Sequence, residues 1–580
     1  MKELVSYQLV DYLERRGVKY IFGLCGHTVI AMLDALKDSK IQFVSVRHEQ
    51  IAAHAADGYS RASKTPAVLM VHLGPGLTNA TTGVANASLD SIPMVVIAGD
   101  VPSYYYGKHP HQEVNMHLDA GQFEIYRPFV KRAWRIDRPE MLPEVLDKAF
   151  TLAVSGRPGP VLISVPMDIF SAEISTEYFE RTKVNTPKIN KPSLDPDIAE
   201  DIVKLLLNAE RPMIYAGGGI ITADASSELE EFAEFLDIPV IYTLMGKGAI
   251  SDAHPLTVGM TGFWGTAFTN EMSRNADVIL GLGTRFSEAD CSSWYRDVTF
   301  NIPPTKLIHI DIDPQEIGRN YPVEIGAVAD VKAALKVLLA VAKDLKPEGI
   351  SRPELRQAIA ENRKKFNMEN EKYVKSDSFP LRPERILAEV REVLPEDGII
   401  VTDVGWNKNG VGQQFPIYKA GTILTPGGLC TMGFGPAAAL GAKLAQPDKK
   451  IMALIGDGAF SSQPSVMATA VEMNIPVVWV VMNNYAFGTI AGLEYSHYKT
   501  TYGTKFMKEG KPYNPDFAAV AMAYGVKGKK ITKASEFKEA LKEALDSDEP
   551  YLIDVPMLNE PVPTSGCWNI NDIYKPRKKA

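Results

Sequence analysis

The chain has 580 residues, enough for about three to four domains of ordinary size. Apolar residues make up 45% of it and charged residues 23%, as in globular proteins, and the net charge of −8 argues against a nucleic-acid-binding platform. No apolar run is long enough to span a bilayer, no signal-peptide core follows Met1, and the four cysteines form no metal-binding spacing. We therefore expect a cytoplasmic protein that has neither nucleic acid nor membrane as a partner.

Three blocks of alternating strand and helix patterns follow one another along the chain. The apolar runs that we predict as strands are 19–23, 43–46, 67–71, 94–98 and 161–166, then 213–217, 239–242, 277–281 and 307–311, and finally 399–402, 451–455, 477–482 and 551–555. Helical patterns lie between these runs, as in parallel sheets with crossover helices. We predict an α/β fold with three doubly wound parallel-sheet domains, at 1–175, 190–345 and 376–560.

Two of the strands in the third block end in polar residues. Gly456-Asp457-Gly458 follows the run 451–455, and Asn484 follows the run 477–482. If these strands are parallel neighbours, both polar side chains meet at the carboxyl edge of one sheet. Oxygen ligands suit Mg²⁺, and the glycines let the backbone approach a ligand closely. Gly-Asp-Gly alone is most often a turn, but the pair of motifs favours a metal site for a diphosphate.

Further motifs extend from one end of the chain to the other. They are V-R-H-E-Q at 46–50, L-G-P-G at 73–76, T-L-M-G-K-G at 243–248, H-I-D-I-D-P at 309–314 and G-G-L-C-T-M-G-F-G at 427–435. In this order they resemble the acetolactate synthase and glyoxylate carboligase family of thiamine diphosphate enzymes. The resemblance implies a pyrimidine-binding, a central and a diphosphate-binding domain. It also implies decarboxylation of a 2-oxo acid such as pyruvate, with carboligation, in a homodimer or homotetramer whose active sites lie between subunits.

The resemblance gives individual residues a role toward thiamine diphosphate. Glu49 matches the carboxylate that binds the pyrimidine N1′ and promotes loss of the C2 proton, although a surface ion pair with Arg47 is the alternative reading. Met432 matches the apolar side chain that supports the bent coenzyme. The implied Mg²⁺ ligands are Asp457, Asn484 and the backbone carbonyl of Ala486. The other implied coenzyme-binding residues are Asn79, Asn407, Gly456, Gly458 and Ala459.

The chain departs from acetolactate synthases at two loops of the first block. His27 and His72 lie where those enzymes have other residues, and imidazoles there could move protons or hydrogen-bond a carbonyl oxygen. The alternative is that each histidine only caps its loop. Gln112, in a segment that matches the family's substrate loop, is a third catalytic candidate. The two histidines are similar to those of cyclohexane-1,2-dione hydrolase, so hydrolysis of a cyclic 1,2-diketone is the alternative function.

A flavin site is a further expectation for the central block. Gly217, Gly218, Arg285 and Asp311 resemble the FAD-binding residues of acetolactate synthase, although a tight turn also explains the glycines. We expect FAD as a possible cofactor, and a flavin-linked 2-oxo acid oxidase is a third candidate function. A non-catalytic scaffold is the last alternative, and the presence of Glu49, Asp457 and Asn484 together argues against it.

Overall fold

The computed structural model describes residues 1–114, 121–182 and 189–576. Within these ranges the chain builds three six-stranded sheets, and every pair of neighbouring strands in them is parallel. Helices flank each sheet, so the predicted α/β fold with three parallel-sheet domains is confirmed. The sheets lie inside the three predicted ranges, whose boundaries stay a prediction.

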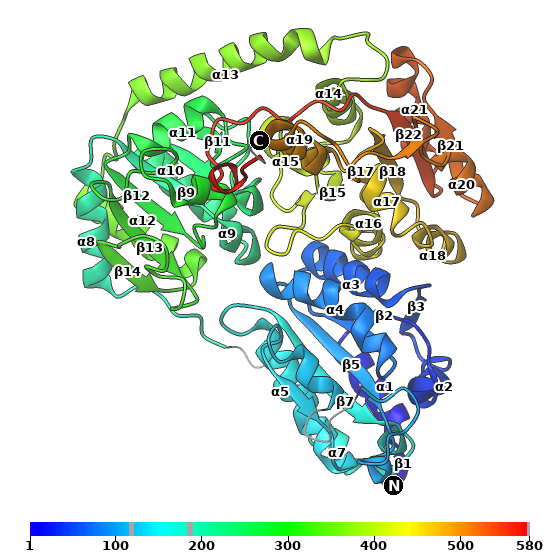
Figure 1. Cartoon of the computed structure of the whole chain (residues 1–580). Coiled ribbons are helices and arrows are strands. Elements are labelled where there is room, and N and C mark those ends of the chain that lie inside the picture. Colours follow the sequence, from blue (N-terminus) through cyan, green and yellow to red (C-terminus); the bar gives the residue numbers. More distant parts are fainter. Residues whose placement is uncertain (115–120, 183–188, 577–580) are drawn as a thin grey trace.

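The N-terminal domain, blue to cyan in Figure 1, has the strand order β3-β2-β4-β5-β7-β6. The strands are β2 (Tyr20–Gly23), β3 (Gln42–Ser45), β4 (Ala67–Val71), β5 (Met94–Asp100), β6 (Ala133–Arg135) and β7 (Pro160–Pro166). The main helices are α1 (Val5–Arg15), α2 (Ile30–Leu36), α3 (Glu49–Ser63), α4 (Pro75–Leu89) and α5 (Leu142–Val154). A short antiparallel pair, β1 (Lys2–Leu4) with β8 (Glu173–Ser175), joins the two ends of the domain.

The central domain, green in Figure 1, has the order β11-β10-β9-β12-β13-β14. The strands are β9 (Pro212–Ala216), β10 (Val240–Tyr242), β11 (Thr257–Met260), β12 (Val278–Leu282), β13 (Lys306–Asp311) and β14 (Ile325–Val328). Its helices are α8 (Pro196–Leu207), α9 (Gly218–Thr222), α10 (Ser226–Leu236), α11 (Ala267–Arg274) and α12 (Val331–Leu345). The charged helix α13 (Pro353–Val374) then leads across the outside of the molecule to the last domain (Figure 1).

The C-terminal domain, yellow to red in Figure 1, has the order β16-β15-β17-β18-β22-β21. The strands are β15 (Ile399–Thr402), β16 (Ile423–Leu424), β17 (Ile451–Gly456), β18 (Val478–Asn483), β21 (Lys527–Lys530) and β22 (Tyr551–Pro556). Its helices are α14 (Pro383–Val393), α15 (Trp406–Gln414), α16 (Phe434–Ala445), α17 (Asp457–Ser461), α18 (Val466–Glu472), α19 (Gly488–Tyr498), α20 (Phe517–Ala523) and α21 (Phe537–Asp546).

The two outer sheets share one topology. When the strands of each sheet are numbered along the chain, both outer sheets have the order 2-1-3-4-6-5, whereas the central sheet has the order 3-2-1-4-5-6. In such sheets there is one point where the chain leaves two neighbouring strands in opposite directions, so that the strand order reverses. Ligands bind in the crevice outside the carboxyl ends of those two strands. The reversal lies between β2 and β4, between β9 and β12, and between β15 and β17. These three points are therefore where functional side chains are expected.

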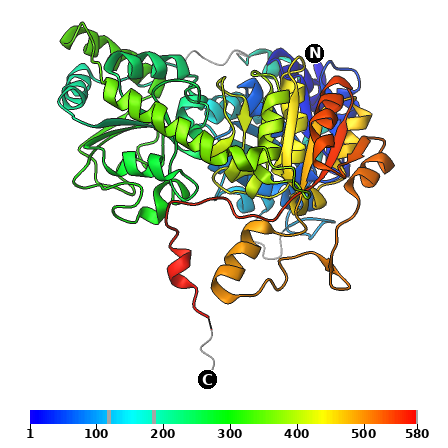
Figure 2. The same ribbon diagram turned by 90° about the horizontal axis from the view of Figure 1, so that it is seen from above.

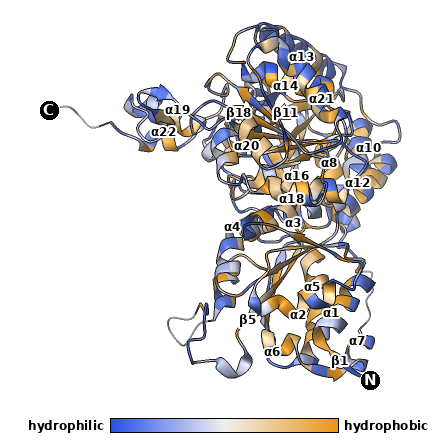
Figure 3. Cartoon of the chain, turned by 90° about the vertical axis from the view of Figure 1, so that its right-hand side faces the viewer, coloured by the Kyte–Doolittle hydropathy of each residue, from blue (hydrophilic) through white to orange (hydrophobic). Residues whose placement is uncertain are grey.

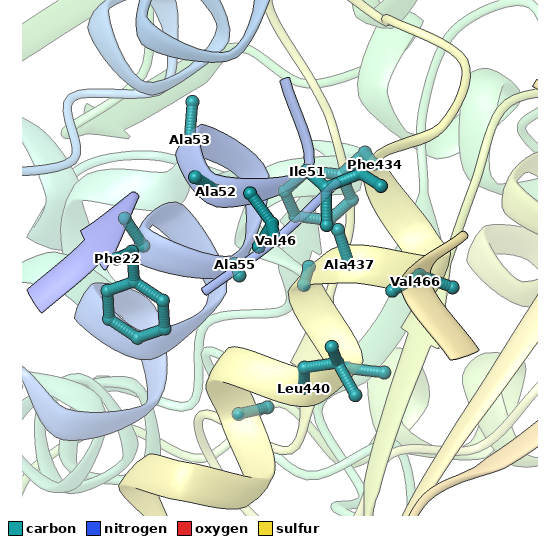
Figure 4. Packing of buried hydrophobic residues seen from close by; sticks show 14 of the residues in the cluster. Phe22, Val46, Ile51, Ala52, Ala53, Ala55, Phe434, Ala437, Leu440 and Val466 are labelled. Atoms are coloured by element: carbon teal, nitrogen blue, oxygen red, sulfur yellow. The ribbon is translucent and has the colours of Figure 1, made fainter. Parts of the chain in front are cut away.

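Helices α3 and α16 join the N-terminal and C-terminal domains in one apolar core (Figure 4). A Cβ atom on Gly58 would lie 2.2 Å from the carbonyl oxygen of Ala438, and one on Gly441 would lie 1.8 Å from that of Ala55. Only glycine permits this close approach of the two backbones. Because residue 58 faces 438 and residue 55 faces 441, the two helices run antiparallel.

The C-terminal segment leaves the last domain and passes along the central one (Figures 2 and 3). Ser565 donates from Oγ to the Gly265 carbonyl at 2.7 Å, and Asn571 Oδ1 lies 2.9 Å from His497 Nε2 on α19. The segment ends with the short helix α22 (Ile570–Ile573) beside α19. Among the helices of the described ranges, none combines the length and apolar character that a membrane span requires.

Candidate active site

The predicted catalytic residues of the N-terminal domain lie at the carboxyl edge of its sheet. His27 follows β2 and His72 follows β4, the two strands at the reversal point. Glu49 follows β3, the neighbour of β2, as the first residue of α3. Residues from three separate parts of the sequence thus meet at one sheet edge.

Glu49 is a buried carboxylate held by one neighbour. Its side chain belongs to a residue that is only 5% exposed, and Asn79 on α4 donates from Nδ2 to Glu49 Oε2 at 3.0 Å. Burial argues against the alternative reading, a surface ion pair with Arg47, and Arg47 pairs instead with Glu472 of the C-terminal domain. The structure therefore favours the reading of Glu49 as a site residue, with Asn79 orienting it.

His72 forms the centre of a hydrogen-bonded chain. Its Nδ1 lies 2.7 Å from Thr28 Oγ1, and its Nε2 lies 3.0 Å from Gln112 Oε1. The Leu73 N–H donates to Thr28 Oγ1, so the Thr28 hydroxyl is free to donate to Nδ1 while Nε2–H donates to Gln112. These two contacts fix the orientation of the His72 ring. Thr28 was not singled out in the sequence analysis.

His27 lies against this chain with its ring more exposed. The centroids of the His27 and His72 rings are 4.5 Å apart, and burial together with the nearby His72 and His111 lowers the pKa of His27. The loop before it requires glycine, because a Cβ on Gly26 would lie 2.4 Å from His72 Cγ. The structure thus gathers all three catalytic candidates, His27, His72 and Gln112, in one cluster.

Asp457 is the buried carboxylate of the C-terminal domain. It begins α17 at the end of β17 and is 1% exposed. Oδ1 accepts from the Gly458 N–H at 2.9 Å, and Oδ2 accepts from the Tyr485 N–H at 2.7 Å and from Asn514 Nδ2 at 2.8 Å. Burial raises the pKa of Asp457 to about 6, although these hydrogen bonds favour the charged form. Asn514 was missed because it lies 57 residues away on a loop.

The other two predicted metal ligands follow the neighbouring strand. β17 and β18 pair in parallel, as the sequence analysis required for a shared site, and Asn484 follows β18 directly. Asn484 donates from Nδ2 to Asn559 Oδ1 at 2.9 Å, which turns its carbonyl oxygen away from that contact. Ala486 is 4% exposed, two residues farther along the same loop. Carboxylate, amide and backbone oxygens on one edge are the donor set that Mg²⁺ prefers.

The reversal point between β15 and β17 has the character of a diphosphate site. Gly456, Gly458 and Ala459 lie at the end of β17, and Asn407 lies in the first turn of α15, which follows β15. Asn407 Nδ2 is 3.6 Å from the position of a Cβ on Gly456. Asn407 Oδ1 is buried and has no hydrogen-bond partner within the described ranges. A buried polar atom without a partner fits a site that a ligand completes.

The loop that carries Met432 is held by a residue that the sequence analysis missed. Asp403 at the end of β15 is fully buried and accepts from the N–H groups of Val404, Gly433 and Gly435. Its carboxylate thereby satisfies the first turn of α16 and fixes the residues after Met432. Met432 itself is 41% exposed, which is unusual for a methionine next to a core helix. A carboxylate directly before Val-Gly at a strand end was the available signal.

A buried ion network fastens the same loop to the N-terminal domain. Arg61 on α3 pairs with Asp57 at 2.5 Å and with Asp90 at 2.7 Å, and its side chain is 7% exposed. Asp90 in turn accepts from the N–H groups of Gly427 and Gly428. The three charges lie in the N-terminal domain, and their hydrogen bonds to the loop cross the domain boundary, which the sequence analysis did not predict.

The predicted flavin-binding residues also share one sheet edge. Gly217 follows β9, Arg285 lies after β12 and Asp311 ends β13, and these strands are neighbours at the reversal point. However, a Cβ on Gly217 would lie 2.1 Å from the Gly283 carbonyl oxygen, and one on Gly218 would lie 3.2 Å from Met245 Cβ. Packing between loops explains these glycines, so they do not form an open cradle. Burial raises the pKa of Asp311 to about 6.

The cluster around Glu49 and the sheet edge that carries Asp457 are the two half-sites of the predicted active site. In one chain these half-sites face away from each other. Glu49 begins α3 and Phe434 begins α16, and because these helices are antiparallel their first residues are about 20 Å apart along the helix axes. The carbonyl of Ser45, near Glu49, accepts from Thr469 on α18 at 2.9 Å. Helix α18 leads back to the amino end of β18, opposite the edge that carries Asp457.

Comparisons with known proteins agree with this arrangement of domains. Residues 5–120, 199–338 and 403–555 match the N-terminal TPP-binding, central and C-terminal TPP-binding domains of thiamine pyrophosphate enzymes. The chain is 38% identical to a probable acetolactate synthase large subunit of Methanocaldococcus jannaschii, over 94% of this chain and 90% of the relative. It is 33% identical to the acetolactate synthase large subunit of Cyanidium caldarium, over 95% and 92% respectively. It is also 33% identical to the isozyme 3 large subunit of Escherichia coli, over 94% and 92%.

Proposed function

We propose, because this chain belongs to the acetolactate synthase large-subunit family of thiamine diphosphate enzymes, that it decarboxylates pyruvate and joins the product to a second 2-oxo acid. The relatives named above are acetolactate synthases, so they support the predicted carboligase. They lend no support to the diketone hydrolase or to the flavin-linked oxidase. The observation that carries the proposal is the pair of buried carboxylates, Glu49 and Asp457, on the two outer sheets.

The residues of the two half-sites fit the coenzyme that the family uses. When bound, thiamine diphosphate would supply a nucleophilic carbon at C2 and an electron sink for the electron pair released with CO₂. Glu49, oriented by Asn79, is placed to exchange a proton at the pyrimidine N1′. Asp457, Asn484 and the carbonyl of Ala486 would hold Mg²⁺. Asn407 would complete the diphosphate site, and Met432 would lie under the bend of the coenzyme.

His72 and His27 are proposed to handle protons at the substrate carbonyl. The two ring nitrogens of His72 are engaged by Thr28 and Gln112, so the ring is oriented rather than free to rotate. His27, with a lowered pKa, is neutral at physiological pH and lies on the open side of the cluster. A neutral imidazole can accept a proton in one step and return it in the next.

The proposal includes a second copy of the chain. A separation of about 20 Å between the first residues of α3 and α16 is longer than a bent coenzyme spans, so one chain cannot grip both ends of it. A partner copy that supplies the opposite half-site removes this difficulty. We therefore propose a homodimer as the smallest active unit, of which a homotetramer would contain two.

Product analysis with a matched variant tests the activity. Incubation with thiamine diphosphate, Mg²⁺ and pyruvate is expected to yield acetolactate and CO₂, whereas cyclohexane-1,2-dione in place of pyruvate is expected to remain intact. The Glu49→Gln variant keeps the shape of the side chain but cannot exchange the proton, so coenzyme should still bind by calorimetry while turnover falls by about 100-fold or more. Normal turnover in this variant would falsify the assignment of Glu49.

Mixed subunits test whether the site is shared. Glu49→Gln and Asp457→Asn chains are each expected to be inactive alone. Co-expression of the two should restore part of the activity, because one of the two sites in a mixed dimer receives both native carboxylates. A mixture that stays inactive, although light scattering shows dimers and mass spectrometry shows mixed ones, would contradict a site built from two chains.

Flavin and cellular location are finer parts of the proposal. The central sheet has the strand order of dinucleotide-binding folds, which supports an FAD hypothesis for the edge with Arg285 and Asp311. The visible absorption spectrum of the purified protein tests it directly. Four cysteines without disulfide bonds are typical of a reducing compartment, so we include a cytoplasmic location in the proposal.

A further inference from the structure

Lys408 and Cys430 form a close contact for which the proposed reaction has no use. Lys408 lies in the first turn of α15, and its Nζ is 2.6 Å from Cys430 Sγ, in the loop between β16 and α16. The lysine is 5% exposed, whereas the cysteine is partly open to solvent. A small oxidant can therefore reach the sulfur while the amine stays beside it.

Backbone geometry and hydrogen bonds hold Cys430 in place. Cys430 has a φ of +57°, in the left-handed region that residues with a side chain seldom adopt. The loop is anchored on one side of Cys430 by Asp90, through Gly427 and Gly428, and on the other side by Asp403, through Gly433. A strained residue that persists because its surroundings fix it is a common feature of functional sites.

The other cysteines lack this arrangement. Cys291 is buried, and burial raises its pKa well above the usual range. Cys25 and Cys567 are exposed, and no contact with a lysine nitrogen is seen at either within the described ranges. Oxidation chemistry that needs an amine next to the sulfur is thus specific to Cys430.

We propose that Lys408 and Cys430 are a redox-sensitive pair, which a peroxide converts into a covalent sulfur–nitrogen bond. The thiol first attacks the peroxide: the O–O bond breaks, sulfur is oxidised to the sulfenic acid and one water leaves. The Lys408 nitrogen then attacks the sulfur through its lone pair, the S–O bond breaks, and a second water leaves with a proton from the nitrogen. Thiol, amine and hydrogen peroxide thus give one sulfenamide and two waters, and the protein loses two hydrogen atoms.

The sulfur–nitrogen bond is expected to affect coenzyme binding. This expectation rests on the proposed function. Cys430 lies two residues before Met432, and Lys408 lies next to Asn407. A covalent link between them ties the Met432 loop to the first turn of α15, on both sides of the proposed coenzyme site. Oxidation by peroxide is therefore expected to block coenzyme binding, and a thiol reductant is expected to reverse the block.

Mass spectrometry of the full-length apo protein tests the bond without any need for activity. Protein is treated with hydrogen peroxide, quenched and digested without reductant, and peptides that join residues 408 and 430 with the loss of two hydrogens are sought. We expect this product in the wild type and in the control variant Cys567→Ser, and its disappearance after treatment with dithiothreitol. Cys430→Ser should give no product.

A conservative lysine variant separates a chemical from a structural role. Lys408→Arg keeps a cationic donor of similar length, but guanidinium stays protonated and does not attack sulfur. In this variant oxidation should stop at a sulfenic acid that dimedone traps. Equal dimedone labelling of Cys430 in wild type and Lys408→Arg, with no cross-linked peptide in either, would overturn the proposal. Circular dichroism of each variant shows that the chain is folded.

Calorimetry with thiamine diphosphate and Mg²⁺ tests the consequence. The oxidised wild type should lose the binding signal and regain it with dithiothreitol, while oxidised Cys430→Ser should bind as the reduced protein does. An unchanged signal in the cross-linked wild type would overturn the coupling to the coenzyme. Absence of binding to the reduced wild type would instead contradict the proposed function, and the mass-spectrometric result would still be readable.

Discussion

At the scale of single residues, the structure buries two carboxylates away from water. Hydrogen bonds from N–H donors partly offset the cost of burying their charge. Asp457 and Asp403 are 1% and 0% exposed, and burial raises the pKa of each to about 6. Each accepts hydrogen bonds from at least two backbone N–H groups. Such a carboxylate is costly to keep charged, and a cation held at Asp457 would lower that cost for Asp457.

The raised pKa of Asp457 predicts a pH dependence of stability. The folded apo protein binds this proton more tightly than the unfolded chain, whose carboxyl has a pKa of about 4. This group therefore stabilises the fold at low pH, and the contribution is lost as the pH rises from about 4 through about 6. Relative to Asp457→Asn, wild-type apo protein should lose about 2 to 3 kcal/mol of stability over that window.

Thermal unfolding between pH 4.5 and 7.5, about the range of this titration, measures the difference between the two proteins. Adding Mg²⁺ and thiamine diphosphate should stabilise the wild type most strongly above pH 6, where the carboxylate is charged. Parallel pH profiles for wild type and Asp457→Asn would show that this carboxyl does not titrate in that range.

At the scale of elements, the packing of α3 on α16 decides how the half-sites are oriented. Both helices are rich in alanine and glycine, so the side chains between them are small and their axes come close (Figure 4). Arg61 lies over the ring of Phe434, 5.0 Å from its centroid, at the end of α3 where the Met432 loop begins α16. The small residues therefore do more than fill a core: they fix the antiparallel order that separates Glu49 from Met432.

Adding one methyl group to this contact should be strongly unfavourable. In Gly441→Ala the new Cβ would meet the Ala55 carbonyl oxygen at 1.8 Å, so the helices must separate, at a cost of about 1 to 3 kcal/mol or more. Gly492→Ala on α19 is the matched control, because nothing lies within 4 Å of its Cβ position. This control should be neutral or gain about 0.5 to 1 kcal/mol of helix stability. Denaturant unfolding compares them, and similar losses in both variants would contradict the packing argument.

At the scale of the whole molecule, a buried ion network with hydrogen bonds to the C-terminal domain and one exposed ion pair connect the N-terminal and C-terminal domains. The Arg61 network is buried and bridges Asp57, Asp90 and the Thr425 carbonyl. The Arg47–Glu472 pair crosses the same boundary with side chains that are 42% and 50% exposed. Burial makes the contributions of the two interactions to stability unequal. Water screens the charges of an exposed pair, but it cannot reach a buried charge that has lost its partner.

The two pairs predict different costs of substitution. Arg61→Met leaves two buried carboxylates without their cation and should lower stability by about 3 to 5 kcal/mol. Arg47→Met should cost less than about 1 kcal/mol. The thermal midpoint ranks the variants. Calorimetry should also show weaker coenzyme binding in Arg61→Met, because Asp90 holds the loop of Met432. Equal midpoints for the two variants would contradict this account.

The class of fold and the interior strands of each sheet follow from the pattern of apolar residues alone. All thirteen apolar runs predicted as strands overlap strands of the structure, because a strand buried on both faces must be apolar throughout. The strands that the sequence analysis missed in the large sheets are β6, β11, β14, β16 and β21, and each of them lies at a sheet edge. An edge strand contacts only one neighbour and tolerates polar residues, as in the Lys-Gly-Lys-Lys of β21.

Parallel pairing also let the sequence place residues from different strands together. Asp457 and Asn484 end strands that proved to be neighbours, and His27, His72 and Glu49 follow three adjacent strands. Only the tertiary structure decided what holds these groups: Asn514 on Asp457, Asp403 under the Met432 loop and Arg61 between two domains. It also decided the opposite orientation of the half-sites, because helix packing depends on contacts between residues about 380 positions apart, which leave no local pattern in the sequence.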